Sequence, residues 1–174
     1  MATESVAMHP IEWMRTDKSL DAHLGKMVRQ ASTLEYFLEQ TAKALSGSPY
    51  GALLISGESI SRVIEACKAL VLAREDASAE WQARFKDTLI ASKNAFERRN
   101  QYVHGSVSWR GPDGIPGTSR SRRLKPEATF IPLDLDDLAS LTREFERLTF
   151  QAAACLSAAL DEFPDHLAED YSDD

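Results

Sequence analysis

The sequence predicts an all-α fold: an antiparallel four-helix bundle with a β-hairpin inserted between the third and fourth helices. Apolar residues recur at three- and four-residue steps along four long segments, which is typical of amphipathic helices. Clusters of turn-forming residues separate most of these segments. Long helices joined by short connections favour antiparallel packing around one shared core.

The first two helices follow from the spacing of their apolar residues. We interpret residues 1–19 as an N-terminal arm, and we expect the first helix to begin at Leu20 and to end at the turn-forming cluster SGSPYG. The second helix is expected from about Glu58 to Arg74. The positions expected to face the core are Leu20, Leu24, Met27, Ala31, Leu34, Leu38 and Leu45, then Ile60, Val63, Ile64, Cys67, Leu70 and Val71.

The third and fourth helices complete the domain, which we place at residues 20–162. Ser78 is a suitable N-cap for the third helix, which is expected to stop near Gly105 because glycine permits the left-handed conformation that ends helices. The segment LDLDDL supplies an aspartate cap for a fourth helix, from roughly Asp136 to Glu162. The core positions are Trp81, Phe85, Leu89, Phe96 and Val103, then Leu138, Leu141, Phe145, Leu148, Ala152, Cys155 and Ala159.

Residues 105–133 differ in character from the helical segments. Glycine and proline are frequent there, and the segments SVSW and ATFIP at its two ends alternate in polarity. We therefore expect two short strands that form a hairpin with a long tip. The tip sequence GPDGIPGTS lacks the lysine of a phosphate-binding P-loop, so we interpret it as a turn.

The composition is that of a single globular domain. The chain has 174 residues, of which 43% are hydrophobic and 27% charged. Glu4 lies early and no apolar core follows it, so no signal peptide is expected, and no apolar run approaches the ~20 residues that cross a bilayer. Cys67 and Cys155 lie in predicted helices, so we expect buried thiols rather than a disulfide. These observations predict a cytoplasmic protein with no membrane association and no cofactor.

The net charge of −7 is concentrated at the C-terminus. Residues 161–174 contain seven acidic and no basic residues, so the rest of the chain is neutral. We define residues 163–174 as an acidic tail, which either aids solubility or shields a basic surface. That basic surface, which can bind the phosphates of a nucleic acid, is expected within residues 110–125, where Asp113 is the single acidic residue beside five basic ones: Arg110, Arg120, Arg122, Arg123 and Lys125.

The stretch FERRNQYVHGSV places polar and charged residues at the end of the third helix. Arg99 follows Phe96 by three residues in the apolar series, so it faces the packed side, where an unpaired guanidinium is costly. Asn100 and His104 are four residues apart and stack on one face. Arg99 and His104 are about 140° apart on an ideal helix. These two side chains can therefore converge on one ligand only if the helix changes at its end.

A structural role is one explanation for these side chains. Arg99 can pair with an acid of the first helix, such as Glu35 or Glu39, and His104 can interact with the carbonyl groups at the end of its own helix. Arg98 points elsewhere and needs no special explanation. A functional role is the other explanation, and the spacing alone does not decide between the two.

The segment RNQYVH resembles the Arg-(polar)-x-x-x-His signature of the HEPN superfamily, the "higher eukaryotes and prokaryotes nucleotide-binding" domains. The fold of that family is similar to the predicted one: it is a compact helical bundle, and its motif lies near the end of a late helix. The resemblance covers the motif closely and residues 20–162 loosely. The insertion is not part of the minimal family plan.

The resemblance implies a metal-independent endoribonuclease with Arg99, Asn100 and His104 as its catalytic residues. In many HEPN proteins the 2′-hydroxyl of RNA attacks the adjacent phosphate, which leaves a 2′,3′-cyclic phosphate and a 5′-hydroxyl. An imidazole titrates near neutral pH, so His104 is the expected acid or base. The guanidinium of Arg99 stays protonated, and its planar fork suits phosphate oxygens. Asn100 is expected to orient His104 or the backbone at the helix end.

The resemblance also implies partners. HEPN proteins commonly dimerise so that two motifs share one cleft, which predicts a symmetric homodimer with both motifs near its axis. RNA is the expected substrate, and Arg120, Arg122 and Arg123 either follow its backbone or form a solvated hairpin tip. Trp109 either stacks on a base or packs within its strand. Toxin–antitoxin or phage-defence biology is the implied setting, with an antitoxin such as a nucleotidyltransferase-like protein.

Two alternatives come from other functional classes. Some HEPN-like proteins bind nucleotides, RNA or protein partners without cleavage, so a non-catalytic binding module is the main alternative. A metal-dependent enzyme is the weaker one, because His9, His23, His104 and His166 lie in separate segments and no HExxH or carboxylate–histidine cluster occurs.

Overall fold

The computed structural model of the protein describes residues 18–110, 115–122 and 125–162. Most of the predicted N-terminal arm, part of the predicted hairpin tip and the acidic tail lie outside the described residues. The elements are α1 (Lys18–Ser46), α2 (Pro49–Ile55), α3 (Ile60–Ala73), α4 (Ala79–Val103), β1 (Ser106–Arg110), β2 (Ile115–Arg122), β3 (Lys125–Pro132) and α5 (Leu135–Glu162).

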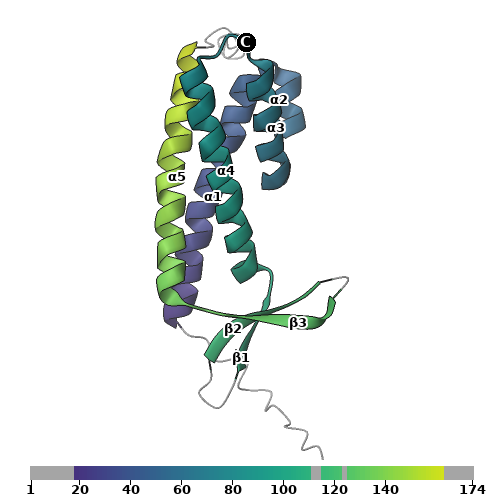
Figure 1. The fold of residues 1–174 in the computed structure, drawn as a ribbon, viewed down its shortest axis with the longest axis vertical. Coiled ribbons are helices and arrows are strands. Elements are labelled where there is room, and N and C mark those ends of the chain that lie inside the picture. Colours follow the sequence, from purple (N-terminus) through teal and green to yellow (C-terminus); the bar gives the residue numbers. More distant parts are fainter. Residues whose placement is uncertain (1–17, 111–114, 123–124, 163–174) are drawn as a thin grey trace, which may run out of the picture.

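The protein is mostly helical, as the spacing of its apolar residues predicts (Figure 1). The four predicted helices correspond to α1, α3, α4 and α5. α2 was not predicted, because it begins inside the SGSPYG cluster that we expected to form a turn. Ser48 is extended and Pro49 occupies the start of the helix, where its fixed φ suits the helix and its missing N–H is not needed.

α2 changes the direction in which the helices run. Figure 1 shows α1 and α5 running in the same direction and α4 in the opposite one. α4 and α5 are antiparallel, since Trp81 at the start of α4 donates its Nε1 hydrogen to the carbonyl of Cys155 near the end of α5 at 3.1 Å. An antiparallel four-helix bundle would have its first and last helices running in opposite directions. This part of the prediction is wrong, because α1 and α5 run in the same direction. The reason is that α2 adds one reversal of the chain between α1 and α3.

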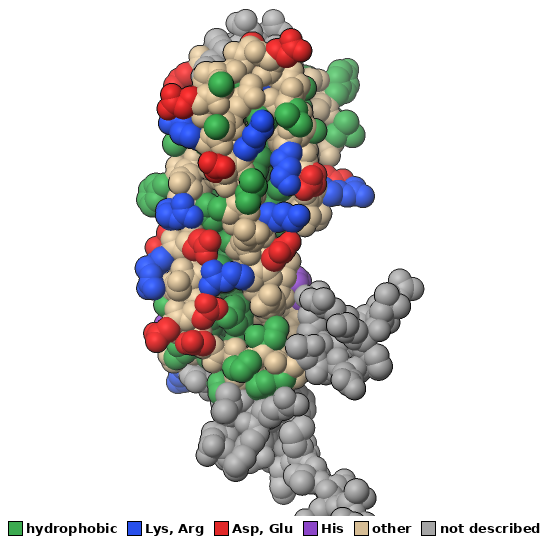
Figure 2. All heavy atoms as spheres, viewed as in Figure 1, with side chains coloured by type: hydrophobic (Ala, Val, Ile, Leu, Met, Phe, Trp, Pro, Cys, Tyr) green, Lys and Arg blue, Asp and Glu red, His purple; other side chains and the backbone are tan. Residues whose placement is uncertain are grey.

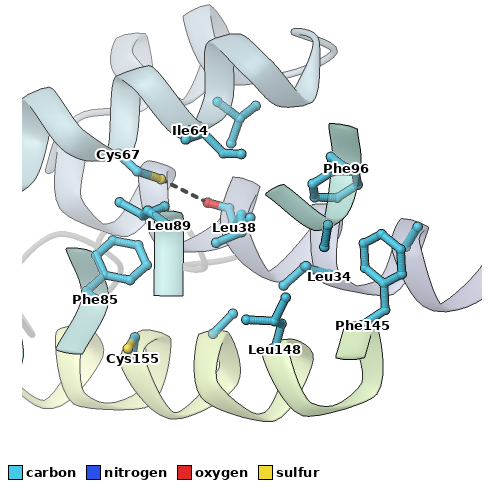
Figure 3. Packing of buried hydrophobic residues seen from close by; sticks show 14 of the residues in the cluster. Leu34, Leu38, Ile64, Cys67, Phe85, Leu89, Phe96, Phe145, Leu148 and Cys155 are labelled. Carbon is cyan, nitrogen blue, oxygen red and sulfur yellow. Dashed lines mark hydrogen bonds between the residues drawn. The ribbon is translucent and has the colours of Figure 1, made fainter. Parts of the chain in front are cut away.

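The core lies between α1, α4 and α5, with α3 closing one side (Figure 3). Leu34 of α1 lies close to Phe96 of α4 and Phe145 of α5, whose rings meet edge-on with their centroids 5.3 Å apart. Full burial of such side chains stabilises the fold by roughly 1.5–3 kcal/mol each. The predicted core positions are buried, except that Leu24, Ile60 and Leu70 are partly buried and Val103 is 37% exposed.

Both cysteines are buried free thiols, as predicted. The Sγ of Cys67 donates a hydrogen bond to the carbonyl of Leu38 at 3.5 Å (Figure 3). Burial raises the pKa of the Cys67 thiol to about 12 and also raises the pKa of Cys155. Because the thiolate is the nucleophilic form, neither cysteine is suited to nucleophilic chemistry at neutral pH.

The insertion between α4 and α5 is a three-stranded antiparallel sheet in the order β1-β2-β3, not the predicted two-stranded hairpin. It lies at the end of the bundle where α4 ends and α5 begins (Figure 1). The additional strand is β2, which we interpreted as part of the tip because it contains Pro116 and Gly117. A side chain at Gly117 would collide with the ring of Phe130 on β3, so close strand packing requires glycine there.

The surface carries mixed charge, and several large apolar side chains are exposed on it. Figure 2 shows Lys and Arg side chains interspersed with Asp and Glu over the face formed by α4 and α5. Tyr50, Leu53 and Leu54 of α2 are 78%, 74% and 77% exposed. None of the helices in the described part of the chain combines the length and apolarity needed to cross a membrane.

Candidate functional site

Arg99, Asn100 and His104 lie at the end of α4, next to the sheet. Ser78 starts this helix as predicted, because its hydroxyl accepts a hydrogen bond from the N–H of Trp81 at 3.3 Å. His104 is the C-cap, with φ −102° and ψ 17°, and its N–H donates to the carbonyl of Asn100 at 3.3 Å. The motif therefore occupies the last turn of α4 and its cap.

Gly105 follows the helix for a different reason from the one predicted. Among the described residues only Gly47 and Gly57 have positive φ, so Gly105 is not in the left-handed conformation. A Cβ atom at Gly105 would lie 2.7 Å from the Cβ of Thr118 and 3.2 Å from the carbonyl oxygen of Ser119. Glycine is needed here because β2 passes close to the end of α4.

Thr118 joins β2 to the end of α4. Its side chain is buried, and its hydroxyl donates to the carbonyl of Gln101 at 2.9 Å. The last carbonyl groups of a helix have no partner within that helix, so Thr118 satisfies one of them. Thr118 was not predicted to contact the motif, because we interpreted its strand as part of the hairpin tip. The backbone of the motif is thus held by the sheet as well as by α4.

The guanidinium of Arg99 is half-buried and has no acidic partner in the part of the chain that the structure describes. Its Nη1 donates to the side-chain oxygen of Asn100 at 3.0 Å, while its Nε is buried without a hydrogen-bond partner. The expected pairing with Glu35 or Glu39 is wrong: within the described residues Arg99 takes part in no ion pair, and Glu39 is bound by Lys43 at 2.6 Å. A buried N–H without an acceptor typically costs ~1–3 kcal/mol. The fold therefore does not explain why an arginine stands here.

Arg98, for which we expected no special role, is held by two carboxylates of α5. It donates from Nη1 to Glu144 and from Nη2 to Asp137, each at 2.7 Å. One turn later, Tyr102 donates its hydroxyl hydrogen to the other oxygen of Asp137. Burial, and then this hydrogen bond, raise the pKa of Tyr102 above its usual value, so its hydroxyl stays protonated. The missed signal is the seven-residue spacing of Asp137 and Glu144, which puts both carboxylates on one face of α5.

Asn100 connects the other two motif residues. Its side-chain oxygen accepts from Arg99, and its main-chain carbonyl accepts from the N–H of His104. The imidazole of His104 is exposed to solvent. Within the described ranges no hydrogen bond joins the side chains of Arg99 and His104. The structure therefore brings the side chains of Arg99 and Asn100 together. His104 lies one turn further along, on the same face of α4 as Asn100.

The sheet brings three of the predicted RNA-binding residues to one end and moves a fourth away. Arg122 of β2 and Lys125 of β3 are partners in register, and Arg120 lies two residues earlier on β2. Ser119, the residue before Arg120, pairs with Ser106 at the start of β1, which follows the motif directly in the chain. This end of the sheet is therefore the one nearest to the motif. Arg110 ends β1 at the opposite end of the sheet, and Arg123 lies outside the described residues.

Among the hollows that border α4 in the described part of the chain, two differ most clearly in their distance from the motif. The larger, about 390 Å³, lies between α4 and α5 and is lined by Trp81, Arg84 and Arg147 among others. Trp81 precedes Asn100 by nineteen residues, which is about 28 Å along a helix. The smaller, about 140 Å³, lies between α3 and α4, and Asn100 forms part of its wall. Of these two, the smaller is the one next to the motif.

Neither metal-binding groups nor known relatives identify the site. Across residues 18–110, 115–122 and 125–162, no three His, Cys, Asp or Glu side chains are grouped so that they can hold a metal ion. Comparisons with models of protein families, with curated proteins and with solved structures found no match. The resemblance to the HEPN superfamily thus rests on the sequence of the motif.

Proposed function

We propose that the protein is a metal-independent endoribonuclease of HEPN type. The observation that carries this proposal is the state of Arg99, a half-buried guanidinium that Asn100 orients and that no carboxylate within the described residues neutralises. A guanidinium left without a counter-ion is available for an anionic ligand, and its fork matches the oxygens of a phosphate. The exposed imidazole of His104 at the same helix end supplies a group that can transfer a proton.

The proposed reaction divides between these residues. The 2′-oxygen of RNA forms a bond to the adjacent phosphorus and loses its proton, and the bond from phosphorus to the 5′-oxygen breaks as that oxygen gains a proton. Arg99 stabilises the charge that develops on the phosphate oxygens. His104 transfers one of the protons. Asn100 holds the guanidinium of Arg99 in place through the hydrogen bond of 3.0 Å.

A second copy of the chain would complete the site. The reaction needs a base and an acid, whereas the motif contains a single imidazole. We therefore propose a symmetric homodimer in which two motifs share one cleft. The exposure of His104 leaves the end of α4 accessible to a second copy. Under this proposal the specific cleavage rate falls as the protein is diluted below the dissociation constant of the dimer.

RNA would extend from the motif along the sheet. Arg120, Arg122 and Lys125 belong to the end of the sheet nearest to the motif, so they are proposed to bind backbone phosphates independently of sequence. Arg110 lies at the opposite end, so it is proposed to contribute less than these three.

RNA cleavage in EDTA tests this function. Wild-type protein is expected to produce fragments with 2′,3′-cyclic phosphate ends. His104→Ala is expected to reduce the rate by ~10²–10⁴-fold through loss of proton transfer. Arg99→Ala is expected to reduce it by ~10²–10³-fold through loss of charge stabilisation.

Matched controls remove a histidine or an arginine elsewhere. His23→Ala on α1 and Arg143→Ala on the exposed side of α5 should leave the rate unchanged. If the wild type and the motif variants do not differ, the nuclease proposal is wrong, and RNA binding without cleavage would favour the non-catalytic binding module.

We also propose the biological setting that the resemblance implies, which is toxin–antitoxin or phage defence with a nucleotidyltransferase-like antitoxin as partner. Growth arrest on overexpression of the wild type, but not of His104→Ala, is the expected result. Absence of toxicity, or no effect of a neighbouring gene on it, would contradict this setting without affecting the cleavage assay.

A further inference from the structure

The hollow beside Asn100 is small and partly apolar. It measures about 140 Å³ and lies between the start of α3 and the last turns of α4. Ile60 and Ile64 of α3 and Phe96 of α4 give it apolar walls. At a share of roughly 30 Å³ per water molecule it holds between four and five waters, which suits a single small heterocycle. Ligand pockets generally combine such apolar walls with a few polar groups that fix orientation.

The rim of this hollow supplies those polar groups. The polar residues that border it include Ser61 of α3 and Lys93, Glu97 and Asn100 of α4. Glu65, which also borders it, is already bound by Lys68 at 2.8 Å, and this hydrogen bond lowers the pKa of its carboxyl group. Within the described residues, by contrast, the carboxylate of Glu97 has neither an ion pair nor a hydrogen bond. Glu97 is therefore the acceptor that remains available to a ligand.

The hollow and the imidazole of the motif share one face of α4. Lys93, Glu97, Asn100 and His104 follow one another at four-, three- and four-residue steps, which places them within about 60° of one another around the helix. One turn separates Asn100 from His104, or about 6 Å of rise. A base is joined to its own 3′ phosphate through a single ribose. A base in the hollow would thus place that phosphate near Asn100 and His104.

We propose that this hollow binds one unstacked RNA base, that of the nucleotide on the 5′ side of the cleaved bond. This inference rests on the proposed function and adds a base preference to it. Single-stranded RNA is commonly read through bases that are splayed out into pockets and hydrogen-bonded on their Watson–Crick edges. Glu97 accepts N–H hydrogens, and guanine offers two adjacent ones, at N1 and N2, to a carboxylate. Guanine is therefore the preferred base, and uracil, with a single N–H, is disfavoured.

Cleavage of a defined RNA measures the preference. The substrate is a 12-nucleotide RNA with one guanosine among uridines, and the variant is Glu97→Gln. Wild-type protein is expected to cut after the guanosine at least about tenfold faster than after any uridine, since one bidentate pair discriminates by this order. Glu97→Gln is expected to remove most of this difference, because the neutral amide does not accept both N–H hydrogens of guanine. Glu80→Gln, an exposed glutamate in the first turn of α4, is the matched control and should change neither rate.

Binding of nucleotides separates the failure of this inference from the failure of the proposed function. Guanosine 3′-monophosphate and uridine 3′-monophosphate are titrated into wild-type protein and Glu97→Gln while the methyl signals of Ile60 and Ile64 are followed by NMR. Guanosine monophosphate should shift both signals and bind more tightly than uridine monophosphate, and Glu97→Gln should abolish the difference. RNA cleavage with no base preference, or with a preference that Glu97→Gln leaves intact, overturns the base pocket and leaves the nuclease standing. If RNA is not cleaved at all, the nucleotide titration alone decides the pocket, and unshifted methyl signals overturn it.

Discussion

Arg98 and Arg99 are neighbours in the last turns of α4, and their surroundings are opposite. Arg98 is bound by Glu144 and Asp137 of α5, each at 2.7 Å. Arg99 lies one position and about 100° further around the helix. It is bound by the neutral amide of Asn100, and its Nε has no partner among residues 18–110, 115–122 and 125–162. The fold uses the first guanidinium to join two helices and makes no such use of the second.

This difference separates a structural face of α4 from a candidate functional one. Two carboxylates neutralise Arg98, so its positive charge is not available to a ligand. Arg99 keeps its charge and accepts the cost of a buried N–H without an acceptor. A side chain that destabilises the fold, with no structural contact to compensate, is typical of residues that bind a ligand. The predictions below change one face at a time.

The largest expected effect comes from Arg99→Lys. Lysine keeps the positive charge but loses the planar fork, so RNA cleavage should fall by about 10²-fold, which corresponds to about 2.7 kcal/mol of transition-state stabilisation. The free energy of unfolding should not decrease, because the buried Nε that lacks a partner is removed. Steady-state kinetics and urea denaturation measure the two quantities. Full activity in this variant would mean that Arg99 does not bind the phosphate in the transition state.

A smaller effect is expected on the other face. Arg98→Met leaves Asp137 and Glu144 without their cation and should lower the free energy of unfolding by about 1–2 kcal/mol. The cost stays below the 3–5 kcal/mol of a fully buried pair because the side chains of Arg98 and Asp137 are 36% and 38% exposed. Arg143→Met, an exposed arginine of α5, is the control and should change stability by less than about 0.5 kcal/mol. Equal stability of the two variants would show that the Arg98 pairs do not hold α4 to α5.

The smallest expected effect is that of Tyr102→Phe, and it depends on pH. Loss of the hydrogen bond to Asp137 should cost about 1 kcal/mol at pH 8. The folded pKa of Tyr102 is raised above its unfolded value of 10.0, so above pH 10 the unfolded chain releases this proton while the folded chain retains it. The stability that wild type gains from Tyr102 is therefore present below pH 10 and lost as the pH rises beyond it. Urea denaturation at pH 8 and near pH 11 should show the difference between wild type and Tyr102→Phe shrinking, and a constant difference would contradict this.

The helices could be predicted because the spacing of apolar residues that indicates each one lies within its own segment of the sequence. Near the end of α4 this spacing misled the prediction, since Val103 is 37% exposed and Tyr102 is buried at 8% exposure in its place. A tyrosine is tolerated there because Asp137 accepts its hydroxyl hydrogen, and that contact comes from a helix thirty-five residues away. Because the buried face of α4 passes through Tyr102 instead of Val103, Arg98, one turn before Tyr102, also faces α5. The rotation of a helix in its last turn thus depends on partners that periodicity does not contain.

The strand β2 and the short helix α2 were missed for the same kind of reason. Gly117 reads as a turn former, and only the ring of Phe130 across the sheet explains it as a strand residue. Gly105 likewise depends on the close approach of Thr118 rather than on its own conformation. The motif itself could be found from the sequence, because Arg99, Asn100 and His104 are close together in it. The structure was needed to show that Arg98 binds two carboxylates while Arg99 binds none within the described ranges.

The most direct test of this account measures RNA cleavage and the free energy of unfolding on the same preparations of Arg98→Met and Arg99→Met. We expect Arg99→Met to lose at least about 10²-fold in rate while its free energy of unfolding does not decrease. Arg98→Met should lose about 1–2 kcal/mol of stability and, at temperatures where it remains folded, keep its rate within about threefold of the wild type. Arg99→Met that cleaves RNA at the wild-type rate, or that is destabilised as much as Arg98→Met, would contradict the claim that Arg99 serves a ligand rather than the fold.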